Sequence, residues 1–190
     1  MAKKIGVYGG TFDPIHCAHL ILAREALEKL GLEQIIFVPA AISPHKLTQT
    51  PTPAPMRVEM LRGAIEGEAR FSMDELELNR PPPSYTFDTI TEFKRRSPQD
   101  QIFYLIGSDN LPRLESWHRF GELRALVQFV VLDRGAGGTH SDFPTIMRHM
   151  DISATEIRKR VATGRSIRYL VPTAVEEIIA RYQLYRDPQR

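Results

Sequence analysis

The sequence contains a single cysteine, Cys17, among its 190 residues. An intramolecular disulfide is therefore excluded, and so is a zinc site built from several cysteines. The sequence also lacks an apolar run of about 18 residues, which argues against a membrane-spanning helix. The basic start MAKKIGVYGG is not followed by the apolar segment of a signal peptide, so we expect none. These shortages favour a cytoplasmic protein without a membrane partner.

Charge of one sign is also scarce, because 25 Lys and Arg residues against 23 Asp and Glu residues leave a formal net charge of +2. The basic triplets 94–96 and 158–160 are short and fall in predicted helices, and a solvated helix face explains the first of them. Nucleic acid is not an expected partner, because a nucleic-acid groove needs a broader basic surface. The balance gives weak support to small anionic ligands. The sequence leaves the oligomeric state open, with a homo-oligomer as one alternative.

Short apolar runs alternate with helical patterns along the chain. Extended segments are expected at 3–8, 34–38, 71–78, 101–106 and 128–132. Helices are expected at 18–30, 56–66, 86–96, 154–162 and 173–182. The last helix has an apolar stripe of Val175, Ile178, Ile179 and Tyr182. Because the apolar strand runs are continuous and do not alternate, they indicate a parallel sheet with both faces covered. We predict an α/β fold with an open, doubly wound sheet, in one domain over 1–190 on which the C-terminal helices (about 153–185) pack.

The turn after the first predicted strand carries the sequence GGTFDPIHCAH, residues 9–19. It lacks the GxGxxG spacing of dinucleotide-binding turns and the GxxxxGK[ST] spacing of P-loops. No acidic residue closes the second strand either, which disfavours a dinucleotide-dependent dehydrogenase. This turn is nevertheless a favoured phosphate position, because the amides at a helix start are unpaired and the helix dipole is positive there. Gly9 and Gly10 would permit close approach of a ligand and positive φ angles.

His16 and His19 lie one helical turn apart and can face the same side of the helix start. The helix dipole opposes further positive charge and so favours neutral rings. Neutral imidazoles that donate N–H bonds to a triphosphate explain the pair best. A pair of polar caps is one alternative, and a zinc site is a weaker one because no third ligand is near. We expect Cys17 to serve packing, although a position at a helix start could lower the pKa of its thiol.

A second phosphate site is predicted in ISATEIR, residues 152–158. Ser153 and Glu156 have the spacing of a capping box, and the two isoleucines have that of a hydrophobic staple. This structural explanation leaves Thr155 and Arg158 free. A hydroxyl and a guanidinium at a helix N-terminus are well suited to phosphate.

Together these motifs resemble the nucleotidyltransferase superfamily that shares its histidine signature with class I aminoacyl-tRNA synthetases. The double glycine and TFDPIH are similar to the nicotinate mononucleotide adenylyltransferase family. The resemblance covers nearly the whole chain and includes SPHK at 43–46, SYTFDT at 84–89, and GSDN at 107–110. It implies a Rossmann-like fold and the conversion of ATP and nicotinate mononucleotide to nicotinate adenine dinucleotide and pyrophosphate, in NAD biosynthesis. Phosphopantetheine adenylyltransferase is one alternative, and a regulatory module that binds nucleotide without turnover is another.

The resemblance also assigns roles to individual residues. Catalysis would depend on His16, His19, Lys46 and Arg158. ATP would bind to Gly9, Gly10, Thr11, Phe12, His16, His19, Ser153, Thr155 and Arg158. The mononucleotide would bind to Lys46, Ser84, Tyr85, Thr86, Asp109, Trp117 and Arg134. In this assignment Asp109 meets the ribose hydroxyls and Trp117 stacks on the pyridine ring.

The implied reaction needs no nucleophilic side chain, because the attacking atom is a phosphate oxygen that is already anionic at neutral pH. The enzyme must align two anions and neutralise charge on the α-phosphate and the leaving group. Mg²⁺ is the expected cofactor, bound mainly through ATP phosphates and water, so no metal cage of protein ligands is expected.

Overall fold

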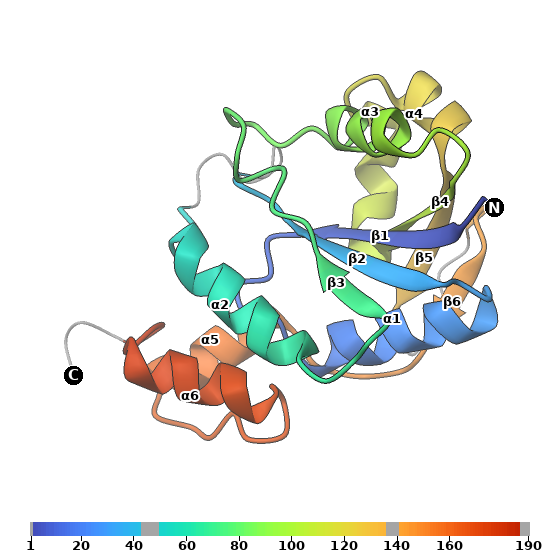
Figure 1. The fold of residues 1–190 in the computed structure, drawn as a ribbon. Helices are drawn as coiled ribbons and strands as arrows, with labels where there is room; N and C mark the ends of the chain where they lie inside the picture. Colours follow the sequence, from blue (N-terminus) through green and yellow to red (C-terminus); the bar gives the residue numbers. More distant parts are fainter. Residues whose placement is uncertain (1, 43–49, 136–140, 187–190) are drawn as a thin grey trace.

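The computed structural model describes residues 2–42, 50–135 and 141–186, and within them a six-stranded sheet forms the centre of the molecule (Figure 1). Its strands are β1 (Lys4–Gly10), β2 (Gln34–Pro39), β3 (Phe71–Met73), β4 (Gln101–Gly107), β5 (Gln128–Asp133) and β6 (Thr145–Met147). All neighbouring strands are parallel, in the order β3-β2-β1-β4-β5-β6. The chain thus runs outward from β1 in one direction and then in the other. The predicted doubly wound α/β fold is confirmed.

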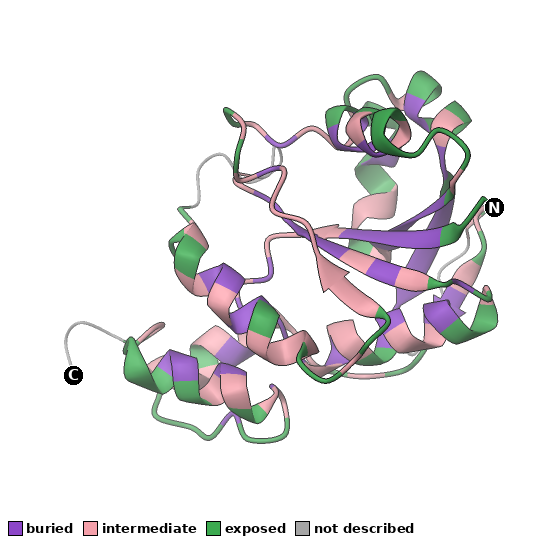
Figure 2. Ribbon diagram, viewed as in Figure 1, coloured by how far each residue is buried: buried purple, intermediate pink, exposed green. Residues whose placement is uncertain are grey.

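Helices cover both faces of the sheet, each over its own hydrophobic cluster (Figure 1). One face carries α1 (Cys17–Lys29), α2 (Ala54–Ile65), α5 (Ala154–Ala162) and α6 (Thr173–Arg181). The other carries α3 (Thr86–Arg96), the 3₁₀ helix η2 (Ser108–Ser116) and α4 (Phe120–Leu126). In β4, Leu105 joins the first cluster, whereas Tyr104 and Ile106 join the second. Because both faces are covered, the strands β1, β2, β4 and β5 are buried along most of their length (Figure 2), which explains their continuous apolar runs.

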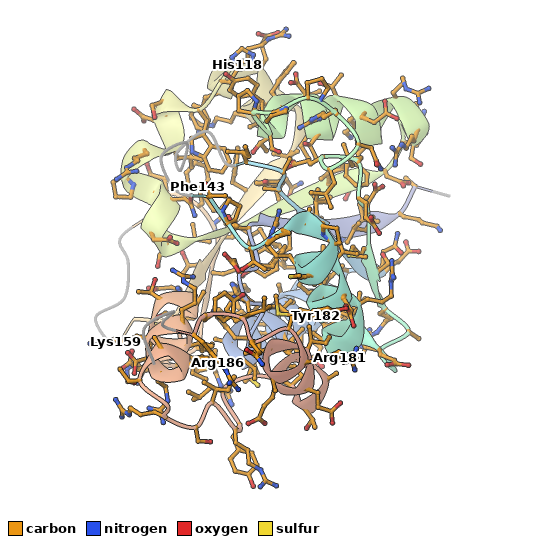
Figure 3. All side chains as sticks on the ribbon, turned by 90° about the vertical axis from the view of Figure 1, so that its left-hand side faces the viewer. His118, Phe143, Lys159, Arg181, Tyr182 and Arg186 are labelled. Atoms are coloured by element: carbon orange, nitrogen blue, oxygen red, sulfur yellow. The ribbon has the colours of Figure 1, made fainter. Side chains whose placement is uncertain are left out.

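The C-terminal helices pack onto the same face as α1 and α2. Ile157 of α5 and Val175 of α6 belong to the cluster that also contains α1 side chains. This shared cluster supports the proposal of one domain over 1–190. The stripe predicted for α6 was wrong at Tyr182, which is 42% exposed (Figure 3). The helix ends at Arg181, and Tyr182 is its C-cap, so it no longer follows the buried face.

Three elements had no clear signal in the sequence, namely η2, α4 and β6. The 3₁₀ helix contains Pro112 and buries only Leu114, so its sequence has the composition of a loop. The strand β6 buries only Ile146. With three residues, this strand is too short to show a periodic pattern. In contrast, the extended segment predicted at 71–78 forms a strand only at 71–73. Among the described residues, no helix is long and apolar enough to cross a membrane.

Candidate active site

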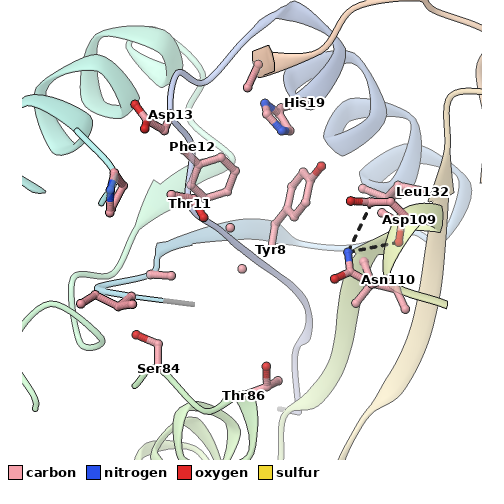
Figure 4. A pocket seen from close by; sticks show the side chains of 18 of the residues that line it. Tyr8, Thr11, Phe12, Asp13, His19, Ser84, Thr86, Asp109, Asn110 and Leu132 are labelled. Carbon is pink, nitrogen blue, oxygen red and sulfur yellow. Dashed lines mark hydrogen bonds between the residues drawn. The ribbon is translucent and has the colours of Figure 1, made fainter. Parts of the chain in front are cut away.

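A cleft of about 1010 Å³ opens beyond the carboxyl ends of β1, β2, β4 and β5 (Figure 4). This is the position at which open α/β sheets bind ligands. Every predicted site residue that the structure describes lines the cleft, whereas Lys46 lies outside the described residues. These lining residues come from five separate stretches of the chain: 9–19, 84–86, 109–117, 134 and 153–158. His19 and Asp13 lie on one side, and Ser84 and Thr86 on the other (Figure 4).

The two glycines of the first turn are required for a reason that differs from the expected one. Neither Gly9 nor Gly10 has a positive φ, and the residue in the left-handed region is Phe12, with φ 48°. A Cβ atom at Gly9 would collide with the Tyr104 hydroxyl, and one at Gly10 would lie 3.0 Å from the Phe12 ring. The glycines therefore make room for two aromatic side chains of the cleft wall.

The histidine pair shares one side of the helix start, as predicted. The rings of His16 and His19 are stacked, with centroids 3.6 Å apart and an interplanar angle of 18°. His16 is the N-cap of α1, and its backbone N–H donates to Nδ1 of His19 at 3.3 Å. Because Nδ1 of His19 accepts this bond, the neutral ring carries its proton on Nε2. His19 thus caps the helix with one nitrogen and retains a donor on the other.

Both rings are neutral at neutral pH, as expected, but burial is the main cause. Burial and the nearby charge of Arg134 lower the pKa of His16 to about 3. Burial, together with the charges of His16 and Arg134, lowers the pKa of His19 well below its usual value. Burial raises the pKa of the Cys17 thiol, so the net shift is opposite to the one that a helix start could cause. Because both rings are neutral, they can stay stacked beside a bound phosphate. Two imidazolium ions at this distance would repel each other.

The low pKa of His16 predicts a specific loss of stability in acid. In the unfolded chain a histidine titrates near pH ~6.5, whereas folded His16 stays neutral down to about pH 3. The unfolded state then binds more protons below pH ~6.5, so stability is complete above that pH and is lost progressively toward the folded pKa, by up to ~1.4 kcal/mol per pH unit. His16→Asn keeps a favoured N-cap residue and removes this titration. Denaturant unfolding between about pH 6.5 and about pH 5 should give a shallower slope for the variant. Equal slopes would contradict a buried, neutral His16.

The start of α5 confirms the predicted cap and shows that Arg158 has partners within the protein. Ser153 is the N-cap, and its Oγ accepts a bond from the backbone N–H of Glu156 at 3.2 Å. Arg158 is not free: Nη1 donates to the backbone carbonyl of Asp13 at 2.6 Å, and Nη2 to Oγ1 of Thr155 at 3.4 Å. The two predicted phosphate motifs are therefore joined directly, across 145 residues of chain.

The SYT segment lies at the opposite side of the cleft, where α3 begins. Ser84 is buried, and its hydroxyl accepts a bond from the backbone N–H of Ala41 at 3.0 Å. This hydroxyl is thus engaged within the protein. Oγ1 of Thr86 lies 3.3 Å from the Tyr104 hydroxyl. The cleft therefore has the Thr86 and Tyr104 hydroxyls and the first amides of α3 at this side.

Aromatic side chains enclose the same side of the cleft. Trp117 follows η2 and is edge-on to Tyr104, with ring centroids 6.2 Å apart. His118 lies against the Tyr85 ring at 4.5 Å, and Figure 3 shows it at the end of the molecule opposite to Arg181. Both residues line the cleft. A flat aromatic ring of a ligand could stack against these aromatic side chains.

Asp109 and Arg134 follow the carboxyl ends of the neighbouring strands β4 and β5. Asp109 is exposed in η2 and receives a long bond, 3.4 Å, from Asn110 (Figure 4). Arg134 follows β5, and Nη1 donates to the carbonyl of Ile152 at 2.6 Å. Its charge lowers the pKa of both active-site histidines. Arg134, which the resemblance assigned to the mononucleotide, is thus also close to the phosphate motifs.

Arg57 of α2, which is 1% exposed, could not be recognised as a site residue from the sequence. Its guanidinium donates to the carbonyls of Thr52 and Thr11, both at 2.8 Å, and to that of Ala41 at 3.5 Å. It therefore holds the first turn and the segment after β2 in place. No local pattern separates an inward arginine from the common outward one, because its partners are distant backbone carbonyls.

A buried polar cluster behind the SYT segment also had no local signal. Oγ1 of Thr89 donates to the buried carboxyl group of Glu77 at 2.5 Å. Arg80 donates to Thr89 at 2.7 Å and to the backbone carbonyl of Tyr85 at 2.9 Å. Burial raises the pKa of Glu77. Through these bonds to Tyr85 and Thr89, the cluster holds the first turn of α3 in place.

Comparison with known proteins gives a consistent result. The profile of the cytidylyltransferase-like family matches residues 7–160. An Exiguobacterium sibiricum protein named probable nicotinate-nucleotide adenylyltransferase is 44% identical over 96% of this chain and 98% of its own length. The nicotinate-nucleotide adenylyltransferase of Bacillus subtilis is 39% identical over 97% of this chain and 100% of its own. Among solved structures, the Plasmodium falciparum nicotinic acid mononucleotide adenylyltransferase complexed with NaAD has a similar fold, with a TM-score of 0.82 at 21% identity, over 96% of this chain and 97% of that one.

Proposed function

The chain belongs to the cytidylyltransferase-like family and, within it, to the nicotinate-nucleotide adenylyltransferases, and from this premise we propose that its cleft transfers the adenylyl group of ATP to nicotinate mononucleotide. The products are nicotinate adenine dinucleotide and pyrophosphate, and the reaction serves NAD biosynthesis. One observation carries the proposal: a single cleft holds two phosphate motifs on one side and the start of α3 with its aromatic neighbours on the other.

ATP occupies the side formed by the first turn and α5. The starts of α1 and α5 present unpaired amides and positive dipole ends to the triphosphate. His19 donates from Nε2, and Arg158 contributes a guanidinium that the Asp13 carbonyl already orients. Arg134 adds a second guanidinium close to the histidines. Lys46 remains a proposed phosphate contact from the sequence motif.

The chemical step requires alignment and charge neutralisation. A phosphate oxygen of the mononucleotide attacks the α-phosphorus of ATP, and a new P–O bond forms. The bond from the α-phosphorus to its bridging oxygen breaks, and the electron pair leaves with pyrophosphate. No proton is abstracted from the nucleophile. Charge that develops on the phosphate oxygens is stabilised by His19 and Arg158, in a site whose donors are held in position beforehand.

The mononucleotide occupies the side formed by α3 and η2. The dipole and first amides of α3 favour a carboxylate, and Thr86 and Tyr104 provide hydroxyl donors. Trp117 stacks on the pyridine ring, and Asp109 meets the ribose. Glu77 is a buried acceptor on this side, but Thr89 donates to it and burial raises its pKa. The bond from Thr89 and the Arg80 guanidinium, 3.7 Å from the carboxyl group, compensate part of a negative charge on Glu77.

Mg²⁺ fits this donor set as an ion carried by ATP. Among the described residues there is no group of three His, Cys, Asp or Glu side chains placed to hold a metal. Mg²⁺ commonly keeps several waters and binds substrate phosphates with few protein ligands. The residues that hold the triphosphate would therefore position the ion indirectly, through the ATP phosphates that bind it. When bound, it neutralises charge on the phosphate oxygens.

The cellular location and the macromolecular partners are proposed from the sequence. We propose a cytoplasmic location and no nucleic-acid or membrane partner. Assembly into a homo-oligomer stays open to a measurement of mass in solution.

The proposed function is tested by offering ATP with nicotinate mononucleotide, nicotinamide mononucleotide or phosphopantetheine. We expect pyrophosphate and a dinucleotide, with kcat/KM for the acid at least about tenfold above that for the amide, or ~1.4 kcal/mol. The preference arises because the start of α3 favours a carboxylate, whereas stacking on Trp117 does not distinguish the two rings.

Competition of the two mononucleotides for limiting ATP measures this preference directly. Preference for the amide would contradict the carboxylate argument. Preference for phosphopantetheine would favour that alternative activity, and ATP binding without turnover on any substrate would favour a regulatory module.

A further inference from the structure

The C-terminal segment after α6 reaches back to the first turn of the chain. The Tyr185 hydroxyl donates to Oδ1 of Asp13 at 2.5 Å, across 172 residues. Tyr185 lines the active-site cleft, and both it and Leu184 pack against the hydrophobic cluster under α1. Gln183 and Tyr185 have φ angles of 53° and 61°. Because residues with a Cβ rarely adopt such angles, the segment is held there by its contacts.

Asp13 is the point at which several distant elements meet. Its Oδ1 accepts from Tyr185, and its Oδ2 accepts from the backbone N–H of Thr52 at 3.1 Å. Its backbone carbonyl accepts from Arg158 at 2.6 Å. Three segments that are remote in sequence therefore fix one residue, which lies three positions before His16.

A carboxylate in this place is a hazard for a site that binds triphosphate. An uncompensated negative charge there would repel ATP. Tyr185 and Thr52 each engage one carboxylate oxygen, so the side chain is directed toward donors of the protein. Burial and the bond to Asp13 raise the pKa of Tyr185, so its hydroxyl keeps its proton and remains a donor.

From these contacts we propose that Tyr185 is a positioning residue for ATP, which acts through Asp13 by orienting that carboxylate and fixing the first turn against Arg158. This inference rests on the proposed binding of ATP to the first turn and α5. It assigns the C-terminal segment a part in the nucleotide side of the cleft and none in the mononucleotide side.

The test is Tyr185→Phe, which removes one hydroxyl and keeps the ring. We expect KM for ATP to rise about five- to tenfold, within the net contribution of one typical hydrogen bond, while KM for nicotinate mononucleotide changes by less than about twofold. Tyr182→Phe is the matched control, because this exposed tyrosine follows the same helix, and it should leave both KM values unchanged. A wild-type KM for ATP in Tyr185→Phe would overturn the proposal. An equal rise in both KM values, with a lowered Tm, would also overturn it, since that result indicates a general structural role.

A double-mutant cycle with Asp13→Ala tests whether Tyr185 acts through Asp13. We expect Tyr185→Phe to have little further effect on KM for ATP once Asp13 is absent, because the two residues form one unit. Additive effects would overturn the proposal and indicate direct contact of Tyr185 with ATP. Calorimetric titration of ATP gives the same comparison without turnover. If wild-type protein binds ATP but transfers no adenylyl group, the proposed function fails while the Tyr185 inference is still decided by the change in ATP affinity. If wild-type protein does not bind ATP, both fail.

Discussion

Replacing His19 by alanine is expected to lower turnover by about 10²–10³-fold, the usual loss when one preorganised donor to a transition state is removed. His19 has a defined donor because its Nδ1 accepts the His16 backbone N–H, which leaves the proton on Nε2. The low pKa of His19 keeps the ring neutral before ATP binds. The negative charge of a bound phosphate then stabilises a hydrogen bond from the Nε2–H group of His19. Steady-state and single-turnover kinetics with saturating ATP measure the change.

The capping role of His19 has to be separated from its catalytic role. His19→Ala also removes the acceptor for the His16 N–H, which costs about 0.5–2 kcal/mol as a typical lost cap. His19→Asn retains an acceptor near the position of Nδ1 and lacks the distal donor, so it should stay stable and yet lose turnover. His19→Gln, whose amide reaches the position of Nε2, should recover part of the rate. His149→Ala is the control, because His149 is exposed outside the cleft. Normal turnover in His19→Asn would restrict the pair to capping.

Replacing Arg57 by leucine is expected to lower the free energy of unfolding by at least about 3 kcal/mol. The substitution leaves the carbonyls of Thr11, Thr52 and Ala41 without their donor, and a buried acceptor without a partner costs about 1–3 kcal/mol. Leucine fills much of the volume, so the loss reports mainly on the hydrogen bonds. Urea unfolding followed by circular dichroism measures it.

Arg62→Leu provides a matched control on the same helix. The Arg62 side chain is 69% exposed and pairs with Glu75 at 3.2 Å. An exposed ion pair contributes about 0–1 kcal/mol, so this variant should remain close to the wild-type stability. A loss at Arg57 no larger than that at Arg62 would contradict the structural role of the buried guanidinium.

The sequence by itself determined the features that depend on neighbouring residues. The apolar runs of β1, β2, β4 and β5 predicted a parallel sheet, because strands covered on both faces are apolar at successive positions. Ser153 predicted the start of α5, because an N-cap bond joins residues three apart. The helical spacing of His16 and His19 likewise predicted that their rings share one side. Short elements such as β6 gave no signal, because three residues show no period.

Only the tertiary structure decided how these local features combine into a site. The order of the strands brings Arg158 to the Asp13 carbonyl and Tyr185 to the Asp13 carboxylate, and no local spacing encodes either contact. Gly9 is required because the Tyr104 hydroxyl from the neighbouring strand occupies the space of a side chain. The pKa of His16 is lowered chiefly by burial, which depends on the packing of distant segments. Hydrogen bonds within a helical turn are specified by residues three or four apart, whereas burial and long-range contacts exist only once the sheet has formed.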